Sequence, residues 1–145
     1  MTKAIFTGSF DPFTVGHASI VQRALPLFDS IVIAVGHNEH KKGMFSVEER
    51  VERIEKHYAN EPKIEVVAYS DLTVDVAKRV GANVIIKGVR SFKDFEYERQ
   101  QAEINKTIGD IETLFLCSDP QYESISSSIV RELIHFGRDV SDMMI

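Results

Sequence analysis

The sequence has a single cysteine, no tryptophan, and only eight glycines and four prolines in 145 residues. One cysteine excludes a disulfide framework and any zinc site built from several cysteines. The low glycine and proline content excludes a linker-rich or disordered chain. We therefore expect one domain over residues 1–145 with a core of its own, since domains cluster near ~100–150 residues.

The sequence also shows no pattern that predicts a leader peptide, a membrane segment or a basic surface. The N-terminus reaches glycine at position 8, too early for a signal peptide, and the longest apolar run, Ile31-Val-Ile-Ala-Val, is far shorter than the ~20 residues of a membrane span. The 17 Lys and Arg residues are outnumbered by 22 Asp and Glu, a net charge of −5. This charge argues against a broad nucleic-acid surface but is compatible with a small basic pocket. We expect a cytoplasmic protein that binds neither nucleic acid nor membranes.

What is present is an alternation of short apolar runs and longer helical patterns. Strands are predicted over 3–7, 31–36, 63–69, 83–87 and 112–117, and helices over 17–28, 46–58, 72–80, 94–108 and 126–136. Pro26 should kink or shorten the first helix. The alternation predicts an α/β fold with a doubly wound, Rossmann-like parallel sheet of five strands in the order 3-2-1-4-5 and helices on both faces.

A doubly wound sheet binds ligands beyond the carboxyl ends of its strands, where the strand order reverses. Here that point lies between the first and fourth strands, and the loop after the first strand contains neither G-x-G-x-x-G nor G-x-x-x-x-G-K-[ST]. Instead, Thr14-Val-Gly-His17 opens a helix, whose first N–H groups attract anions and whose histidine can donate to a phosphate oxygen. On this tetrapeptide alone, a surface histidine that only caps the helix is an equal alternative.

Three stretches, residues 8–17, 87–98 and 124–128, carry a closer resemblance. They read Gly-Ser-Phe-Asp-Pro-Phe-Thr-Val-Gly-His, Lys-Gly-Val-Arg-Ser-Phe-Lys-Asp-Phe-Glu-Tyr-Glu and Ser-Ile-Ser-Ser-Ser. The tetrapeptide resembles the T/H-x-G-H signature of the nucleotidylyltransferase superfamily, and the three stretches together resemble the phosphopantetheine adenylyltransferase family. The resemblance implies reversible transfer of the adenylyl group of ATP to 4′-phosphopantetheine, which gives dephospho-coenzyme A and pyrophosphate. It implies direct attack without a covalent intermediate, Mg²⁺ held mainly by the ATP phosphates with no ligand from the protein, and a homohexamer.

The resemblance also assigns roles to individual residues. It makes His17 the stabiliser of the transition state and adds Lys41 and Arg90 as catalytic residues. It assigns ATP binding to Ser9, Phe10, His17, Gly88, Val89, Arg90, Glu98, Tyr122, Glu123, Ser124, Ile125, Ser126, Ser127 and Ser128. It assigns binding of 4′-phosphopantetheine to Ser9, Lys41, Thr73 and Lys87. Lys87 stands where the family usually has arginine, so the charge is kept but the bidentate fork is lost.

Several of these residues have plainer alternatives. Phe10 could simply pack in the core, Glu98 could form a structural ion pair with an arginine, and one serine of the last stretch would suffice as an N-cap. The lone Cys117 is expected to be a buried thiol. A second apolar stripe on the helix over 94–108, formed by Tyr97, Ile104 and Ile108, is compatible with an oligomer.

Two other functions remain open from the sequence. One is another nucleotidylyltransferase, with nicotinamide mononucleotide or glycerol 3-phosphate as the acceptor. The other is a non-catalytic sensor of adenine nucleotides on the same fold, which would need neither His17 nor Lys41.

Overall fold

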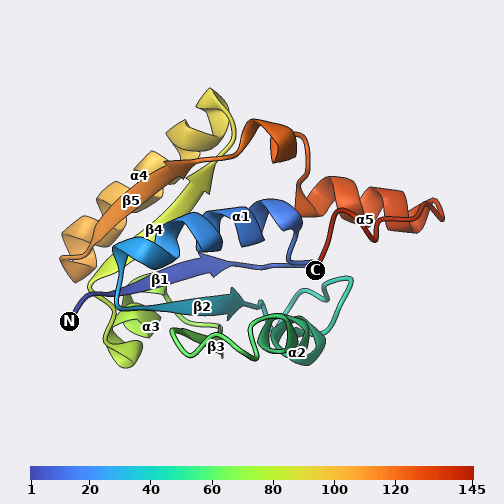
Figure 1. Cartoon of the computed structure of the whole chain (residues 1–145). Coiled ribbons are helices and arrows are strands. Elements are labelled where there is room, and N and C mark those ends of the chain that lie inside the picture. Colours follow the sequence, from blue (N-terminus) through green and yellow to red (C-terminus); the bar gives the residue numbers. More distant parts are fainter.

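The computed structural model describes residues 1–145. The elements are β1 (Lys3–Gly8), α1 (Val15–Ala24), β2 (Ser30–Gly36), α2 (Val47–His57), β3 (Ile64–Tyr69), α3 (Thr73–Val80), β4 (Val84–Val89), α4 (Phe92–Gly109), β5 (Glu112–Cys117) and α5 (Ser127–His135). The five strands form one parallel sheet in the order β3-β2-β1-β4-β5, which confirms the predicted fold (Figure 1).

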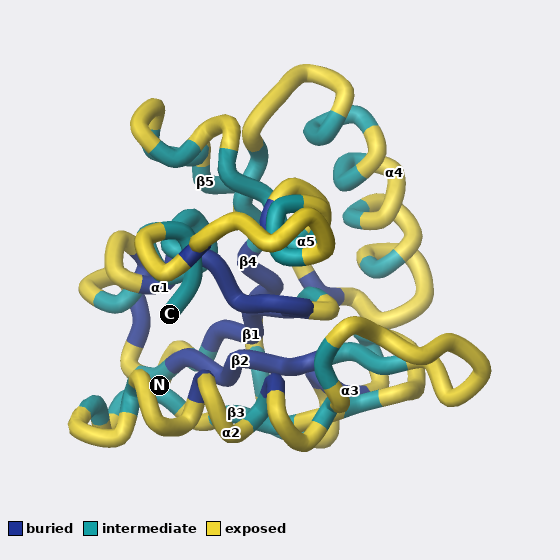
Figure 2. The backbone as a smooth tube through the Cα atoms, turned by 90° about the vertical axis from the view of Figure 1, so that its right-hand side faces the viewer, coloured by how far each residue is buried: buried dark blue, intermediate teal, exposed yellow.

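The centre of the sheet is apolar on both faces, as its β-branched runs predict. In the sheet, Ile5 of β1 lies between Val32 of β2 and Ile85 of β4. Ile31, Ile33 and Val35 of β2 pack with α1 and α2 on one face of the sheet. Val32 and Ala34 pack with α3 on the other face. The central strands β1 and β2 and the first half of β4 are therefore buried, whereas the edge strands β3 and β5 are buried only in part (Figure 2).

The helix ends follow local chemistry, with some differences from the prediction. The α1 helix ends at Ala24, because the chain tightens at Pro26 into a 3₁₀ turn over Leu25–Leu27. The α4 helix begins two residues before the predicted Asp94, since the hydroxyl of Ser91 accepts the N–H of Asp94 and caps it.

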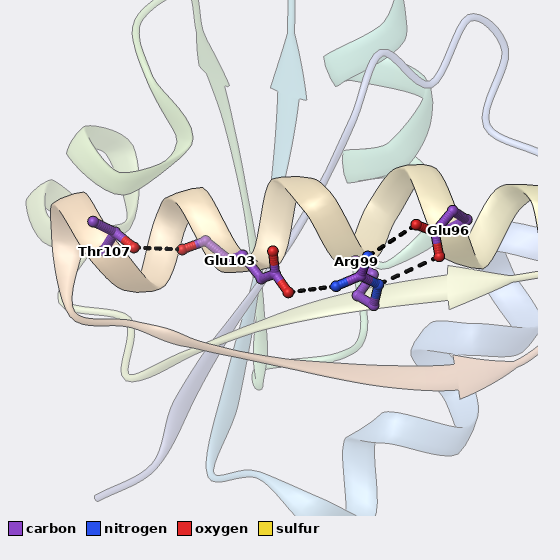
Figure 3. A network of polar contacts seen from close by, with 4 residues as sticks. All are labelled: Glu96, Arg99, Glu103 and Thr107. Atoms are coloured by element: carbon purple, nitrogen blue, oxygen red, sulfur yellow. Dashed lines mark hydrogen bonds and ion pairs between the residues drawn. The ribbon is translucent and has the colours of Figure 1, made fainter.

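The α4 helix lies over β4 and β5 but buries none of its residues fully (Figure 2). Along one side, Arg99 forms ion pairs with Glu96 and Glu103, and the hydroxyl of Thr107 donates to the carbonyl of Glu103 (Figure 3). Such pairs three and four residues apart stabilise a helix that gains little from packing. No helix of the chain is both long enough and apolar enough to cross a membrane.

Candidate active site

A cavity of about 320 Å³ opens at the carboxyl ends of β1 and β4. The turn after β1, the start of α1, the end of β4, one side of α4 and the start of α5 all contribute to its lining. The α5 helix lies on the side toward which the strand arrows point (Figure 1). The cavity therefore occupies the place where the sheet topology predicts a ligand.

The ring of His17 lines this cavity at the first turn of α1. Its Nδ1 accepts the backbone N–H of Thr14 at 2.9 Å, and the backbone N–H of His17 donates to the Thr14 hydroxyl at 3.3 Å. The two residues thus form a reciprocal capping box. Because Nδ1 accepts a hydrogen bond, the proton of the neutral ring is on Nε2, which has no partner within the chain.

His17 is held in its neutral form. Burial lowers its pKa from the ordinary 6.5 to about 4, and the positive charges of Arg90 and Lys87 act in the same direction. A neutral ring with the proton on Nε2 is a hydrogen-bond donor throughout the physiological pH range. The capping role and a donor role are therefore not alternatives, because they use different nitrogens of one ring.

Aromatic side chains fix the position of the His17 ring. Phe10 and Phe13 lie with their centroids 5.0 and 5.2 Å from it, and Phe10 is only 3% exposed. The core-packing alternative for Phe10 is thus observed for its ring, although Phe10 also lines the cavity. Phe10 therefore packs against the His17 ring whether or not it also contacts a nucleotide.

Lys87 and Glu98 face each other inside the cavity. The ammonium of Lys87 lies 3.7 Å from Oε2 of Glu98 and donates to the carbonyl of Thr7 at 3.4 Å. The ion-pair alternative for Glu98 therefore holds, but its partner is a lysine of the cavity rather than an arginine. Lys87 also lies within β4, which continues to Val89, so the prediction that the strand ends at Lys87 is wrong.

Gly88 and Arg90 come shortly after Lys87 in the sequence and also line the cavity. A Cβ on Gly88 would lie 2.9 Å from the side chain of Ile20, so glycine lets α1 approach β4 closely. The guanidinium of Arg90 pairs with the carboxylate of Asp94 at 3.5 Å and remains 41% exposed. Arg90 is therefore a cation on the cavity wall that can still reach a ligand.

The start of α5 supplies hydroxyls and free N–H groups. Ser126 is the N-cap and accepts the N–H of Ile129, while the hydroxyl of Ser127 donates to the carbonyl of Pro12. One serine, Ser126, is thus the cap, which agrees with the plainer alternative. The backbone N–H groups of Ser127 and Ser128 lie in the first turn of α5, where the helix itself offers no acceptor for them. All three serines line the cavity.

Arg131 is a cavity residue that the sequence analysis missed. It lies one turn into α5, donates to the hydroxyl of Ser128 at 3.2 Å and to the backbone carbonyl of Asp11 at 2.9 Å. Unlike Lys87 and Arg90, it has no carboxylate within ion-pair distance. The signal was its spacing of three residues from Ser128, which puts both side chains on one face of a helix.

The cavity thus combines three cations, a helix start and a fixed imidazole donor, a set suited to a polyphosphate. The cytidylyltransferase-like family model matches residues 5–133. Phosphopantetheine adenylyltransferase from Porphyromonas gingivalis is 52% identical over 97% of this chain and 92% of its own. The enzyme of that name from Phocaeicola vulgatus is 50% identical over 99% of this chain and 95% of its own. The chain belongs to the cytidylyltransferase-like family and, within it, to the phosphopantetheine adenylyltransferases.

Family membership confirms the resemblance seen in the sequence and makes the chain a nucleotidyltransferase. Among solved structures, a bifunctional NMN adenylyltransferase/ADP ribose pyrophosphatase from Francisella tularensis matches with a TM-score of 0.71. The match has 17% identity and covers 99% of this chain but only 44% of that one, so it supports the fold alone.

Some residues assigned from the phosphopantetheine adenylyltransferase resemblance lie outside the cavity lining. Lys41 is exposed in the loop after β2 and lines a separate hollow of about 360 Å³. Thr73 is the first residue of α3, Val89 is the last of β4, and Glu123 and Ser124 precede α5. None of these five contributes to the lining of the cavity around His17.

Cys117 corrects another expectation. Its thiol is exposed at the end of β5, not buried. The reason is that β5 is an edge strand, and α4 covers it only in part. The next residue, Ser118, lines the cavity, so the thiol is next to the site in sequence.

Proposed function

We propose that the cavity transfers the adenylyl group of ATP to 4′-phosphopantetheine, giving dephospho-coenzyme A and pyrophosphate in the biosynthesis of coenzyme A. The observation that carries the mechanism is the 2.9 Å bond from the N–H of Thr14 to Nδ1 of His17, which makes Nε2–H the free donor. The relatives at about 50% identity carry the choice of acceptor, since they are phosphopantetheine adenylyltransferases.

The reaction needs little covalent work from the protein. A phosphate oxygen of the acceptor attacks the α-phosphorus of ATP, the bond to the bridging oxygen breaks, and pyrophosphate leaves with that electron pair. A phosphate monoester is already nucleophilic near neutral pH, so no general base is required. His17 would donate from Nε2 to an α-phosphate oxygen, where a fixed donor favours the transition state over the ground state.

The ATP side would be built from the start of α5 and the cations near it. The N–H groups of Ser127 and Ser128 and the guanidinium of Arg131 suit the β- and γ-phosphates, because a helix start favours anions. Arg90, which also lines the cavity, would contact phosphate oxygens. The other assigned ATP-binding residues, Ser9, Phe10, Gly88, Val89, Glu98 and 122–126, remain part of this proposal.

The acceptor side would be formed by Ser9, Lys41, Thr73 and Lys87. Lys87 brings a positive charge to the cavity, and Glu98 orients it without removing it. Lys41 is exposed in the loop after β2, so it would reach the acceptor phosphate from outside the cavity lining. Thr73 would contact the pantetheine arm from α3.

The residues present fit a divalent ion that is held by ATP rather than by the protein. No three His, Cys, Asp or Glu side chains gather where they could hold a metal ion. The two carboxylates of the cavity, Asp94 and Glu98, already pair with Arg90 and Lys87. Mg²⁺ bound to the phosphates would neutralise part of their charge.

The proposal extends to assembly and location. On α4, the residues Tyr97, Ile104 and Ile108 are 63, 52 and 55% exposed in the single chain, and a homohexamer would cover them. We also propose that the protein is located in the cytoplasm, because ATP is the co-substrate of this reaction. The organisation as one domain over residues 1–145 also stays a prediction.

Release of pyrophosphate on mixing the protein with ATP and 4′-phosphopantetheine is the deciding experiment. Nicotinamide mononucleotide and glycerol 3-phosphate should give no release under the same conditions. Release with one of those acceptors alone would assign a different transferase. ATP binding without release with any acceptor would favour the nucleotide sensor.

A further inference from the structure

Asp11 is a buried carboxylate in the turn after β1, and none of the roles proposed above uses its side chain. Only 7% of the residue is exposed. Its Oδ2 accepts the backbone N–H of Met44 and its Oδ1 accepts the backbone N–H of Phe45, both at 2.8 Å. Both carboxylate oxygens of Asp11 therefore accept hydrogen bonds from the loop between β2 and α2, near the start of α2.

Arg50 holds the same loop from the other side. It is equally buried, and its Nη1 donates to the carbonyls of Ser9 at 2.7 Å and Gly36 at 3.1 Å. Its Nε donates to the carbonyl of Phe45 at 3.1 Å. One side chain thus joins the turn after β1 to both ends of the loop that carries Lys41.

The contact at Asp11 is tight. A Cβ on Gly43 would lie 2.6 Å from Oδ2 of Asp11, a distance that side chains do not adopt. Any residue larger than glycine at position 43 would therefore displace the carboxylate or the loop. Lys41, two residues earlier, has no side-chain partner of its own and takes its position from the backbone on either side.

We propose that Asp11 is a positioning residue that fixes the loop over 37–45 beside Ser9, so that Lys41 meets the acceptor phosphate. Asp11 and Arg50 together attach the loop to the turn after β1, so Lys41 and Ser9 keep a fixed relative position although they follow different strands. The identity of the acceptor rests on the proposed function, but the attachment of the loop does not. Asp11 acts through Lys41 and has no contact with ATP in this scheme.

The test is the Asp11→Asn variant, which keeps one acceptor oxygen and leaves one buried N–H unpaired. The KM for 4′-phosphopantetheine should rise roughly tenfold, the usual consequence of losing a charged hydrogen bond, while the KM for ATP changes little. In a Lys41→Ala background the same substitution should add nothing to the acceptor KM, since the two residues act as one unit. A substitution that only impaired folding would not raise the KM for one substrate and leave the KM for the other unchanged.

Two further variants complete the design. Gly43→Ala displaces the same carboxylate from the loop side and should give the same split between the two KM values, also where Asp11→Asn does not fold. Glu39→Gln removes one negative charge from the same loop at an exposed position and should leave both KM values unchanged. A change in KM caused by net charge alone would appear in Glu39→Gln as well, and it would be a fall, because losing a negative charge favours an anionic acceptor.

Amide hydrogen exchange supplies a measurement that is independent of activity. The N–H groups of Met44 and Phe45 should exchange roughly tenfold faster in Asp11→Asn, with β1 and α5 unchanged. Unchanged exchange, equal rises in both KM values, or an additive effect with Lys41→Ala would overturn the proposal. A wild-type protein inactive with 4′-phosphopantetheine would overturn the proposed function instead, and the exchange rates would still decide the role of Asp11.

Discussion

Lys87 and Glu98 form a half-buried ion pair between β4 and α4, with Nζ 3.7 Å from Oε2 and each side chain 22% exposed. Two residues assigned to different substrates thus stand in direct contact. The pair brings the acceptor-binding cation next to the nucleotide side of the cavity, and water screens it only in part. An incoming phosphate would compete with Glu98 for the Lys87 ammonium.

Lys87→Ala should therefore weaken the acceptor more than ATP. We expect the KM for 4′-phosphopantetheine to rise roughly 10- to 100-fold, as for a lost charged hydrogen bond, with a smaller change for ATP. Lys87→Arg should keep most activity, because arginine retains the charge and is usual here in the family. Steady-state kinetics with each substrate varied would check this, and equal losses for both substrates would point to a purely structural pair.

His17→Ala should lower kcat by roughly 10²–10³, like the removal of one oxyanion donor, with little change in ATP affinity. The loss should be the same in the direction of ATP synthesis, since both directions share one transition state. Forward and reverse kinetics together with calorimetry of ATP binding measure these quantities. A fall in ATP affinity alone would leave His17 as a binding and capping residue.

The pKa of about 4 for His17 predicts a neutral ring with its proton on Nε2 from pH 5 upward. NMR of the imidazole nitrogens should show this tautomer and no titration near pH 6.5. Below pH 6.5 the unfolded chain takes up a proton that the folded chain refuses until about pH 4. The free energy of unfolding should thus fall over this window by at most about 3 kcal/mol more than in His17→Gln. A ring that titrates at 6.5 would contradict the neutral donor.

Direct transfer predicts that no adenylyl group becomes attached to the protein. Incubation with α-labelled ATP alone should leave the chain unlabelled, and Cys117→Ser should keep most activity although its thiol is exposed near the cavity. Mass spectrometry of the intact chain would check the first statement, and the rate of pyrophosphate release by Cys117→Ser would check the second. One label per chain before the acceptor is added would establish a covalent route.

If the stripe of Tyr97, Ile104 and Ile108 is an interface, the protein should run well above 16.4 kDa in size exclusion with light scattering. Ile104→Glu and Ile108→Glu should shift it to smaller species, because a charge in an apolar interface has no partner. Glu103→Gln, on the neighbouring face of α4, is the matched control. A wild-type monomer at micromolar concentration would contradict the hexamer.

The sequence by itself determined the order of elements and predicted where a ligand would bind on the sheet. The alternation of apolar strands and amphipathic helices fixes a doubly wound sheet, because parallel strands require a crossover between them. The turn after β1 and the end of β4 then had to meet at the switch point. The motifs around His17, Lys87 and Ser126 were visible because each lies at or near the end of such an element.

The tertiary structure decided what depends on contacts between residues far apart in the chain. The neutral state of His17 follows from burial beside Lys87 and Arg90, some 70 residues away. The Glu98 partner, the exposure of Cys117 and the link from Asp11 to the loop of Lys41 are of the same kind. The local sequence pattern indicates which residues can be buried or carry a charge. Tertiary packing decides which atoms are buried and which partners they contact, and spacing along the sequence does not give this information.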